Sequence, residues 1–474
     1  MPDFDVIVLG GGPGGYGVAL RAAVRGLRVA LIETDKVGGT CLHWGCIPSK
    51  AMLHVGSVMD EAREADRFGL DLTVAGLDVA KLATFRESVQ TQLYKGLEGL
   101  IRSRKIELVT GFGRVGPDGL SVMISGGDRD GATLSGDNVV IAVGSSVRSL
   151  PGIDIDGDVV ITSDEATKLA RVPDKALVIG SGAVGLEFAS LFKSLGASQV
   201  IVVEALERIA PLEDADLSKA LARAFRKRGI TTLAGTVADS VTMVEGSTGK
   251  AATVSLSNGD AHVVDTVLVA VGRKPRTADI GLDTVGPQGS GVLDERGYVV
   301  ADPYGKTAVP GLWAVGDILP PPALALAHAG FAEGFNVADQ IAGHDVVPVD
   351  YTQVPRVTYC SPEVASVGLT QAQAVELHGE DATFFSYSYK GNAKGIIHRS
   401  DGFVKVVTGG PDNAVLGVHI IGPHATDLIA EAQLITAWGA LPAEVGALVH
   451  PHPTLAEAMG EAHMAAAGLP FHTH

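Results

Sequence analysis

The feature that most constrains the fold is a glycine-rich loop between an apolar strand and a helix, and this loop occurs twice. In the first copy, residues 5–9 predict a strand, residues 16–25 a helix and residues 28–32 a second strand. In the second copy, about 170 residues later, residues 176–179 and 199–203 predict the two strands. The positions that carry the pattern are Gly10, Gly12, Gly15 and Glu33 in the first copy and Gly180, Gly182, Gly185 and Glu204 in the second.

This order of strand, glycine loop, helix, strand and acid is the order that a Rossmann dinucleotide-binding unit requires. The first glycine makes the tight turn, the second lets the backbone approach the pyrophosphate, and the third allows close packing of the helix against the strand. The helix N-terminus then faces the phosphates, and the terminal glutamate accepts hydrogen bonds from a ribose. Two copies in register therefore predict two dinucleotide sites and two cofactors.

The acid of the second copy, Glu204, also bears on the kind of nucleotide. A carboxylate at this strand end accepts a hydrogen bond from a free ribose 2′-hydroxyl but repels a 2′-phosphate. Arg208 lies nearby, but one arginine beside a carboxylate is a poor phosphate clamp. The sequence thus favours NAD over NADP, and the alternative for either glutamate is a solvated strand end.

Two of the three cysteines, Cys41 and Cys46, follow the first glycine loop in the stretch GGTCLHWGCIPSK. The chain opens directly into a strand without the features of a secretion signal, which predicts a cytoplasmic location. Reducing compartments keep structural disulfides rare, so a close cysteine pair there is more often catalytic, redox-sensing or metal-binding. Zinc would need further ligands, and no second pair supplies them. The pair therefore suggests a redox-active disulfide beside a flavin, with two inert buried thiols as the alternative.

A bond between these two cysteines requires an irregular backbone. Residues five apart in an ideal helix lie about 8 to 9 Å from each other, beyond the limit of about 7 Å for Cα atoms bridged by a disulfide. Glycine permits unusual dihedrals and proline removes a helix donor, so the segment has the means to be distorted. The residues that supply this freedom are Gly38, Gly39, Gly45 and Pro48.

The length and charge of the chain narrow the possible classes. With 474 residues, 46% of them apolar, three or four domains are expected. No apolar run of about 20 residues predicts a helix that spans a membrane. The formal net charge of −17 works against binding to nucleic acid or to an anionic membrane. An acidic surface suits a basic protein partner, and the alternative is that the charge only maintains solubility.

Over its whole length, the chain resembles the pyridine nucleotide-disulfide oxidoreductases, and most closely those that oxidise dihydrolipoamide. The resemblance rests on both glycine loops, the stretch around Cys41 and Cys46, residues 314–317 (AVGD) and residues 450–457 (HPHPTLAE). It implies an α/β fold with two Rossmann-like domains and a C-terminal α+β dimerisation domain. The expected divisions are residues 1–150 (first part of the FAD-binding domain), 151–275 (NAD-binding domain), 276–350 (central segment that completes the FAD-binding region) and 351–474 (interface or dimerisation domain).

The resemblance also implies roles for individual residues. His452 is implied as the catalytic base, reached from the neighbouring subunit, and Glu457 as the group that orients its imidazole. A histidine suits this task because its unperturbed pKa lies near neutrality. For His450 a satisfied loop residue is expected, and for Cys360 a small buried hydrophobe. The implied cofactor residues are Gly10, Gly12, Gly15, Glu33, Gly113, Asp317 and Ala325 for FAD, Gly180, Gly182, Gly185, Glu204 and Gly272 for NAD, and Lys50 with Glu187 as an ion pair beside the flavin and the nicotinamide.

The implied activity is flavin-dependent oxidation of dihydrolipoamide, with NAD reduced to NADH through a Cys41–Cys46 disulfide and FAD. The implied partners are a second copy of the chain, lipoyl domains, and the basic subunit-binding module of a 2-oxoacid dehydrogenase acyltransferase or the lipoyl protein of glycine cleavage. One alternative is an NADPH-dependent reductase of a glutathione- or mycothiol-type disulfide, which Glu204 and residues 47–50 disfavour. Another is a flavin-bearing structural subunit, which has no need for Cys41, Cys46 and His452 together.

Overall fold

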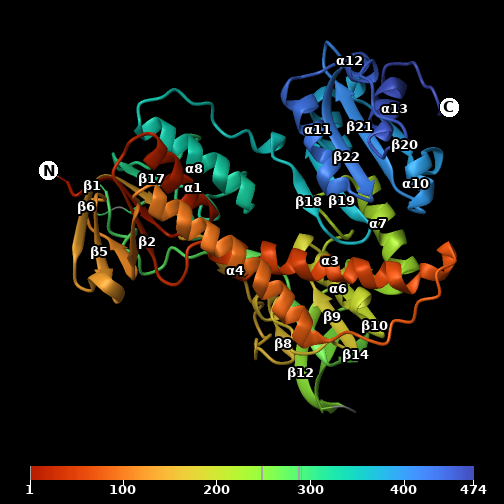
Figure 1. Ribbon diagram of the computed structural model, residues 1–474, viewed down its shortest axis with the longest axis horizontal. Coiled ribbons are helices and arrows are strands. Elements are labelled where there is room, and N and C mark those ends of the chain that lie inside the picture. The colour runs from red at the N-terminus through yellow and green to blue at the C-terminus, as the bar shows by residue number, and fades with distance from the viewer. Residues whose placement is uncertain (1, 247–248, 287–288, 290, 474) are drawn as a thin grey trace. The chain divides into compact units, whose positions relative to one another are not determined.

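The computed structural model describes residues 2–246, 249–286, 289 and 291–473, and the chain divides into two compact units. The first unit comprises Met1–Ala51, Ala83–Arg148 and Arg273–Tyr351, and the second comprises Met52–Leu82, Ser149–Gly272 and Thr352–His474. Two long helices, α3 (Cys46–Arg63) and α4 (Val79–Ser103), each contribute residues to both units. Each unit contains its own sheets and helices (Figure 1).

The core of the first unit is a mainly parallel sheet in the order β3-β2-β1-β6-β5-β4, with β17 paired to the same strand β6. Residues 6–9 of its central strand β1 are an unbroken apolar run that is buried on both faces, as is typical of parallel sheets. β5 and β4 continue the sheet antiparallel. The strands are β1 (Phe4–Leu9), β2 (Val29–Glu33), β3 (Glu107–Thr110), β4 (Phe112–Val115), β5 (Ser121–Ser125), β6 (Thr133–Ile141) and β17 (Leu312–Ala314), and β7 (Ser145–Val147) pairs separately with β16 (Arg273–Pro275).

Helix α1 (Pro13–Val24) packs closely against α8 (Ala327–Ile341) in the first unit, as Figure 1 shows. A Cβ on Gly334 would lie 2.7 Å from the carbonyl oxygen of Gly14, so only glycine permits this approach. At the far end of the contact, Asp339 accepts hydrogen bonds of 2.7–2.8 Å from Arg21 and Arg25. These three bonds hold the pKa of Asp339 well below its usual range.

The second unit contains a parallel sheet in the order β11-β10-β9-β15-β8, which carries the second glycine loop. Helices α6 (Ala183–Leu195) and α7 (Ala215–Lys227) follow β9 and β10, as in a Rossmann unit. A three-stranded antiparallel sheet, β12-β13-β14, accompanies it. The strands are β8 (Val160–Ile161), β9 (Lys175–Ile179), β10 (Gln199–Glu204), β11 (Ile230–Ala234), β12 (Ala238–Gly246), β13 (Gly249–Leu256), β14 (Ala261–Val264) and β15 (Thr266–Val269).

The C-terminal part of the second unit is a five-stranded antiparallel sheet in the order β18-β19-β22-β21-β20, with helices packed against it (Figure 1). Its strands are β18 (Arg356–Thr358), β19 (Glu363–Gly368), β20 (Thr383–Ser388), β21 (Phe403–Gly409) and β22 (Ala414–Gly422). Its helices are α9 (Gln371–His378), α10 (Ala393–Ile397), α11 (Ala425–Ala437), α12 (Pro442–Gly446) and α13 (Glu457–Ala466). The α/β fold class predicted from the sequence is confirmed. None of the helices among the described residues combines the length and the apolar character needed to cross a membrane.

A buried ammonium group joins this antiparallel sheet to the start of α7. The side chain of Lys405 on β21 is 2% exposed, and its Nζ donates to Asp214, Asp216 and Gln371 at 2.6–2.8 Å. Burial would raise the pKa of Asp214, but the bonds from Lys405 and from the Gln371 N–H, together with the charges of His419 and Lys405, outweigh burial and lower this pKa. All three protons of the ammonium are therefore used, and removing the lysine would leave the carboxylate of Asp214 buried without its charge partner.

Replacing Lys405 with methionine should destabilise the second unit by about 3 to 5 kcal/mol, because the charge of Asp214 is left uncompensated. The matched control is Lys390→Met, which removes an exposed lysine 3.2 Å from Asp401 and should cost at most about 1 kcal/mol. Urea denaturation of both variants measures the difference. Equal losses of stability would contradict the role assigned to the buried ammonium.

Candidate functional site

The first glycine of each loop makes a turn that only glycine can make. Gly10 has φ of +104° and Gly180 has φ of +100°. A Cβ at either position would lie 2.4 Å from a carbonyl oxygen, that of Ala142 for Gly10 and that of Ala270 for Gly180. The chain therefore turns sharply at the carboxyl end of the strand in both units.

The second and the third glycine of each loop have different surroundings. A Cβ on Gly15 would lie 1.8 Å from the carbonyl oxygen of Gly10, and the equivalent contact of Gly185 is 2.0 Å, so these two allow close helix packing. By contrast, a Cβ on Gly182 would meet nothing within 4 Å, and one on Gly12 only an atom at 4.0 Å. The second glycine thus faces open space at the helix N-terminus, where the backbone can approach a phosphate. Both loops fit a dinucleotide.

The two terminal glutamates hold the glycine loops in place. Glu33 accepts a hydrogen bond of 2.7 Å from the backbone N–H of Gly11, and Glu204 accepts bonds of 2.8 and 2.6 Å from the backbone N–H and hydroxyl of Ser181. Each carboxylate therefore lies beside its loop, as a ribose-binding acid must. Arg208 donates instead to the carbonyl oxygens of Pro211 and Glu213, so its charge is engaged in its own loop.

The cysteine segment is irregular, as its glycine content predicted. Cys41 lies in the short helix α2 (Gly39–His43), and Cys46 is the first residue of α3. Gly38 has φ of +108° and Gly39 of +55°, and the helix breaks at Trp44 before α3 begins. Both cysteines are half-buried.

The two thiols are electrostatically unequal. A hydrogen bond to Cys46, burial and the charge on Cys46 all raise the pKa of Cys41, and nearby Lys50 opposes this effect. Tyr16 lies beside the pair, and burial together with the two cysteines raises its pKa to about 12. These surroundings therefore favour the protonated form of Cys41.

The other residues that the sequence predicted for the site in the first unit are Asp317, Gly113 and Ala325. Asp317 follows β17 and contributes to the raised pKa of Cys41; it accepts a hydrogen bond of 2.5 Å from Ser145. Gly113 lies in β4, where a Cβ would approach Leu9 to 2.4 Å. Ala325 is exposed in the segment that precedes α8.

In the second unit, Glu187 is buried on α6 and accepts a 3.0 Å bond from the backbone N–H of Tyr359. Lys50 belongs to the first unit, so its pairing with Glu187 stays a prediction. Gly272 follows β15 with φ of +104° and open space where a Cβ would lie. Cys360 is a buried thiol, as expected, and burial raises its pKa.

His452 and Glu457 form a bonded pair at the start of α13. The side chain of His452 is 76% exposed, and its Nδ1 lies 2.8 Å from Glu457 Oε1. Because a carboxylate only accepts, Nδ1 carries the proton and the lone pair of Nε2 faces outward. Burial would raise the pKa of Glu457, but the bonds from the Thr454 N–H and from His452 outweigh it and lower that pKa. The arrangement is that of an oriented general base.

Two carboxylates were not anticipated from the sequence, Glu333 in the first unit and Glu431 in the second. Glu333 on α8 is buried, and burial raises its pKa. It accepts bonds of 2.5 Å from the Gly316 N–H and 2.9 Å from the Tyr351 hydroxyl, so it fixes the turn that carries Asp317. Its sequence signal is an acid among the small and aromatic residues 329–335. Glu431 forms a hydrogen bond with His450, which lies 19 residues further along the chain. No local sequence pattern predicts this pair.

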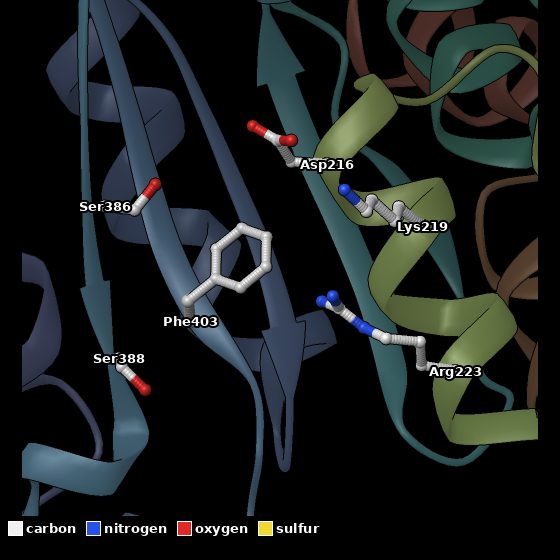
Figure 2. A pocket seen from close by; sticks show the side chains of 6 residues that line it. All are labelled: Asp216, Lys219, Arg223, Ser386, Ser388 and Phe403. Atoms are coloured by element: carbon white, nitrogen blue, oxygen red, sulfur yellow. The ribbon is translucent and has the colours of Figure 1, made fainter. Parts of the chain in front are cut away.

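A cavity of about 260 Å³ lies between α7 and the edge of the C-terminal sheet (Figure 2). Figure 2 shows the side chains of Lys219 and Arg223 from α7 facing Phe403 across it. It contains none of the residues predicted for the site. The lining residues are Asp216, Lys219, Arg223, Ser386, Ser388 and Phe403.

The unequal surroundings of the loop glycines predict unequal effects of a methyl group. Gly185→Ala should destabilise the protein because its Cβ would lie 2.0 Å from the carbonyl oxygen of Gly180. Gly182→Ala should fold normally, since its φ of −69° suits any residue, but it should weaken dinucleotide binding by filling the phosphate approach. Thermal melting and NAD titration separate the two effects. A Gly182→Ala variant that binds NAD as tightly as the parent would contradict this assignment.

Comparison with known proteins agrees with this geometry. Residues 4–334 match the family described as pyridine nucleotide-disulphide oxidoreductase, and residues 354–463 match its dimerisation domain. The chain is 37% identical to a dihydrolipoyl dehydrogenase of Bacillus subtilis and 36% identical to one of Zymomonas mobilis, each over 99% of both chains. It is also similar to the crystal structure of LpdA from Mycobacterium tuberculosis, with a TM-score of 0.88 and 26% identity over 97% of this chain and 99% of that one.

The matches cover both glycine loops, the cysteine pair and the His452–Glu457 pair within one continuous alignment of nearly the whole chain. FAD and NAD are the cofactors of the dihydrolipoyl dehydrogenases in this group, in accord with the two dinucleotide folds. The chain belongs to the pyridine nucleotide-disulphide oxidoreductase family.

Proposed function

We propose that this protein is a dihydrolipoyl dehydrogenase, which oxidises dihydrolipoamide to lipoamide and reduces NAD to NADH. The observation that carries the proposal is the oriented pair of His452 and Glu457, whose free Nε2 is presented at the surface. Oxidation of a dithiol requires a proton acceptor of this kind, because only a thiolate attacks a disulfide. The full-length similarity to dihydrolipoyl dehydrogenases supports the same reading.

The two glycine loops are the proposed cofactor sites. Bound FAD would accept the electron pair of the enzyme dithiol and pass it on to NAD as a hydride. The first unit would hold FAD through Gly10, Gly12, Gly15, Glu33 and Asp317, with Gly113 and Ala325 as further contacts. The second unit would hold NAD through Gly180, Gly182, Gly185, Glu204 and Gly272, with Lys50 and Glu187 as an ion pair beside the flavin and the nicotinamide.

Proton transfer and thiol exchange fall to the residues of this chain. The reaction begins with Cys41 and Cys46 joined in a disulfide. His452 takes a proton from one substrate thiol, and the resulting thiolate attacks Cys41. The Cys41–Cys46 bond breaks, a mixed disulfide with Cys41 forms, and Cys46 leaves as a thiolate. His452 releases its first proton to solvent and takes the proton of the second substrate thiol, whose thiolate attacks the substrate sulfur of the mixed disulfide; the bond to Cys41 breaks, lipoamide leaves, and Cys41 takes the proton back from His452. The raised pKa of Cys41 suits its recovery of a proton in this step.

The proposed active unit is a homodimer in which His452 serves the disulfide of the partner subunit. His452 and its loop lie within residues 354–463, which match a dimerisation domain. Large apolar side chains are exposed on the same domain, among them Trp438 at 78% and Val449 at 96%. A second copy of the chain would cover such surface and bring the base to a disulfide.

The proposed substrate carriers are lipoyl domains of a 2-oxoacid dehydrogenase complex or the lipoyl protein of glycine cleavage. The net charge of −17 suits docking of a basic subunit-binding module of an acyltransferase. Such docking would weaken as salt rises, because surface charges are screened.

The flavin-loaded protein should form NADH from dihydrolipoamide and NAD, and the rate with NADP should be at least about tenfold lower, a difference of about 1.4 kcal/mol. The physical reason is repulsion between the Glu204 carboxylate and a 2′-phosphate. Absorbance at 340 nm follows both reactions, and a lipoyl domain can replace free dihydrolipoamide in a parallel assay. Flavin that is reduced only by NADPH, with turnover of glutathione or mycothiol disulfide, would instead establish the alternative reductase.

A hybrid dimer tests whether His452 acts across the subunit interface. Chains carrying Cys46→Ala and chains carrying His452→Gln are each expected to be inactive as homodimers, the second by about 10² to 10⁴-fold. In the hybrid, the intact cysteines of one chain meet the intact histidine of the other, so one of the two sites should work. Tandem-affinity purification of the hybrid followed by the NADH assay measures this. An inactive hybrid would show that the histidine serves its own chain.

A further inference from the structure

A second histidine–glutamate pair lies beside His452, and no step of the proposed reaction uses it. His450 Nε2 is 2.8 Å from Glu431 Oε1, and the His450 side chain is only 11% exposed. Since a carboxylate only accepts, His450 donates this bond. Glu431 belongs to α11, whereas Glu457 belongs to α13, so the two pairs tie the histidine loop to two different helices.

The His450 ring is also held from the other side by α13. A Cβ on Gly460 would lie 2.7 Å from His450 Nδ1 and 3.0 Å from its Cε1, which is closer than real Cβ contacts come. Glycine inside a helix is less favourable than alanine, because it loses more conformational freedom on folding. The close approach of the ring gives a physical reason for a glycine at this buried helical position.

The segment between the two anchors is short and stiff. On the far side of His452, Thr454 donates its N–H to Glu457 and its hydroxyl to the carbonyl oxygen of Pro451, at 2.8 and 2.7 Å. The buried amide of Asn392 donates to the carbonyl oxygen of Thr454 at 2.9 Å. The prolines on either side of His452 restrict the backbone further.

The groups that face His450 favour its bond to Glu431. This bond raises the pKa of His450, and so favours its charged form. The neighbouring His463 is fully buried, donates from Nδ1 to the carbonyl oxygen of Met459, and has its pKa lowered by burial to about 4. It is therefore neutral near pH 7 and does not compete as a cation for Glu431.

We propose that Glu431 and His450 are positioning residues for His452. Their bond fixes the N-terminal side of the histidine loop, as Glu457 and Thr454 fix its C-terminal side, and together they present Nε2 of the base at a defined place. This inference rests on the proposed function, because it concerns His452 as the base. Neither Glu431 nor His450 touches the reacting thiols in this scheme.

Three variants and one control test the proposal in the flavin-loaded dimer. Glu431→Ala removes the bond, and Gly460→Ala displaces the His450 ring while Glu431, His452 and Glu457 remain. Both should lower kcat for dihydrolipoamide oxidation by about 10 to 100-fold, the scale expected when a reacting group is misplaced by about 1 Å. Glu431→Gln keeps an acceptor oxygen and should restore activity. Glu376→Ala, on the exposed face of α9, should change nothing.

Two readouts separate positioning from general damage to the structure. Reduction of the flavin by NADH needs no proton removal by His452, so it should be unchanged in every variant. The solvent deuterium isotope effect on kcat should rise in Glu431→Ala and Gly460→Ala, because proton removal becomes slower. Light scattering checks that the variants remain dimers. Should Glu431→Ala fail to fold, Gly460→Ala carries the same test.

Wild-type activity in Glu431→Ala and Gly460→Ala would overturn the proposal, as would an equal loss of NADH-driven flavin reduction. If the unaltered protein itself does not oxidise dihydrolipoamide, the proposed function fails, and a readout independent of activity decides the inference. The NMR resonance of the labelled His452 ring, assigned with His452→Gln, should shift in Glu431→Ala and not in Glu376→Ala. An unshifted resonance would overturn the positioning role.

Discussion

The site depends on a close contact between a helix backbone and the turn that precedes it, and this contact occurs once in each unit. Gly15 and Gly185 bring a helix onto the turn at Gly10 and Gly180 at distances where a Cβ would overlap a carbonyl oxygen. This places the first turn of each helix, with its unpaired N–H groups, at the carboxyl end of a central strand. The open space beside the second glycine of each loop is a direct result of this geometry.

Three buried ionisable groups of this protein are each held by hydrogen bonds from or to their neighbours. Lys405 donates three hydrogen bonds, Glu204 accepts from the backbone and hydroxyl of Ser181, and Glu333 accepts from Gly316 and Tyr351. In a low dielectric each such group is costly to leave unpaired, so each fixes the geometry of its neighbours. His452 is the contrasting case. Its orienting bond is internal, while its reactive nitrogen is exposed, which suits a base that acts on another chain.

Much of the site could be predicted because its parts are close in sequence. The glycine loops, their terminal glutamates and the break between Cys41 and Cys46 follow from spacings of a few residues to one supersecondary unit. The pairing of His452 with Glu457 was implied by the family resemblance. The groups that escaped prediction are distant in sequence. Lys405 meets Asp214 across 191 residues, and Glu431 meets His450 across 19, through packing of separate elements. Residues 52–82 likewise pack with the second unit, a placement that no local pattern signalled.

The sequence by itself determined the α/β class and the two dinucleotide folds, because these depend on local backbone geometry, and it predicted the redox cysteines and the base from side-chain chemistry and the family resemblance. Only the tertiary structure decided which groups hold them in place. Glu333 at the turn before Asp317, Lys405 beneath α7, and Glu431 with Gly460 around His450 are fixed by which helix faces which sheet. Such contacts depend on the burial of whole faces, and the energy of a buried polar group depends on neighbours that are far away in the chain.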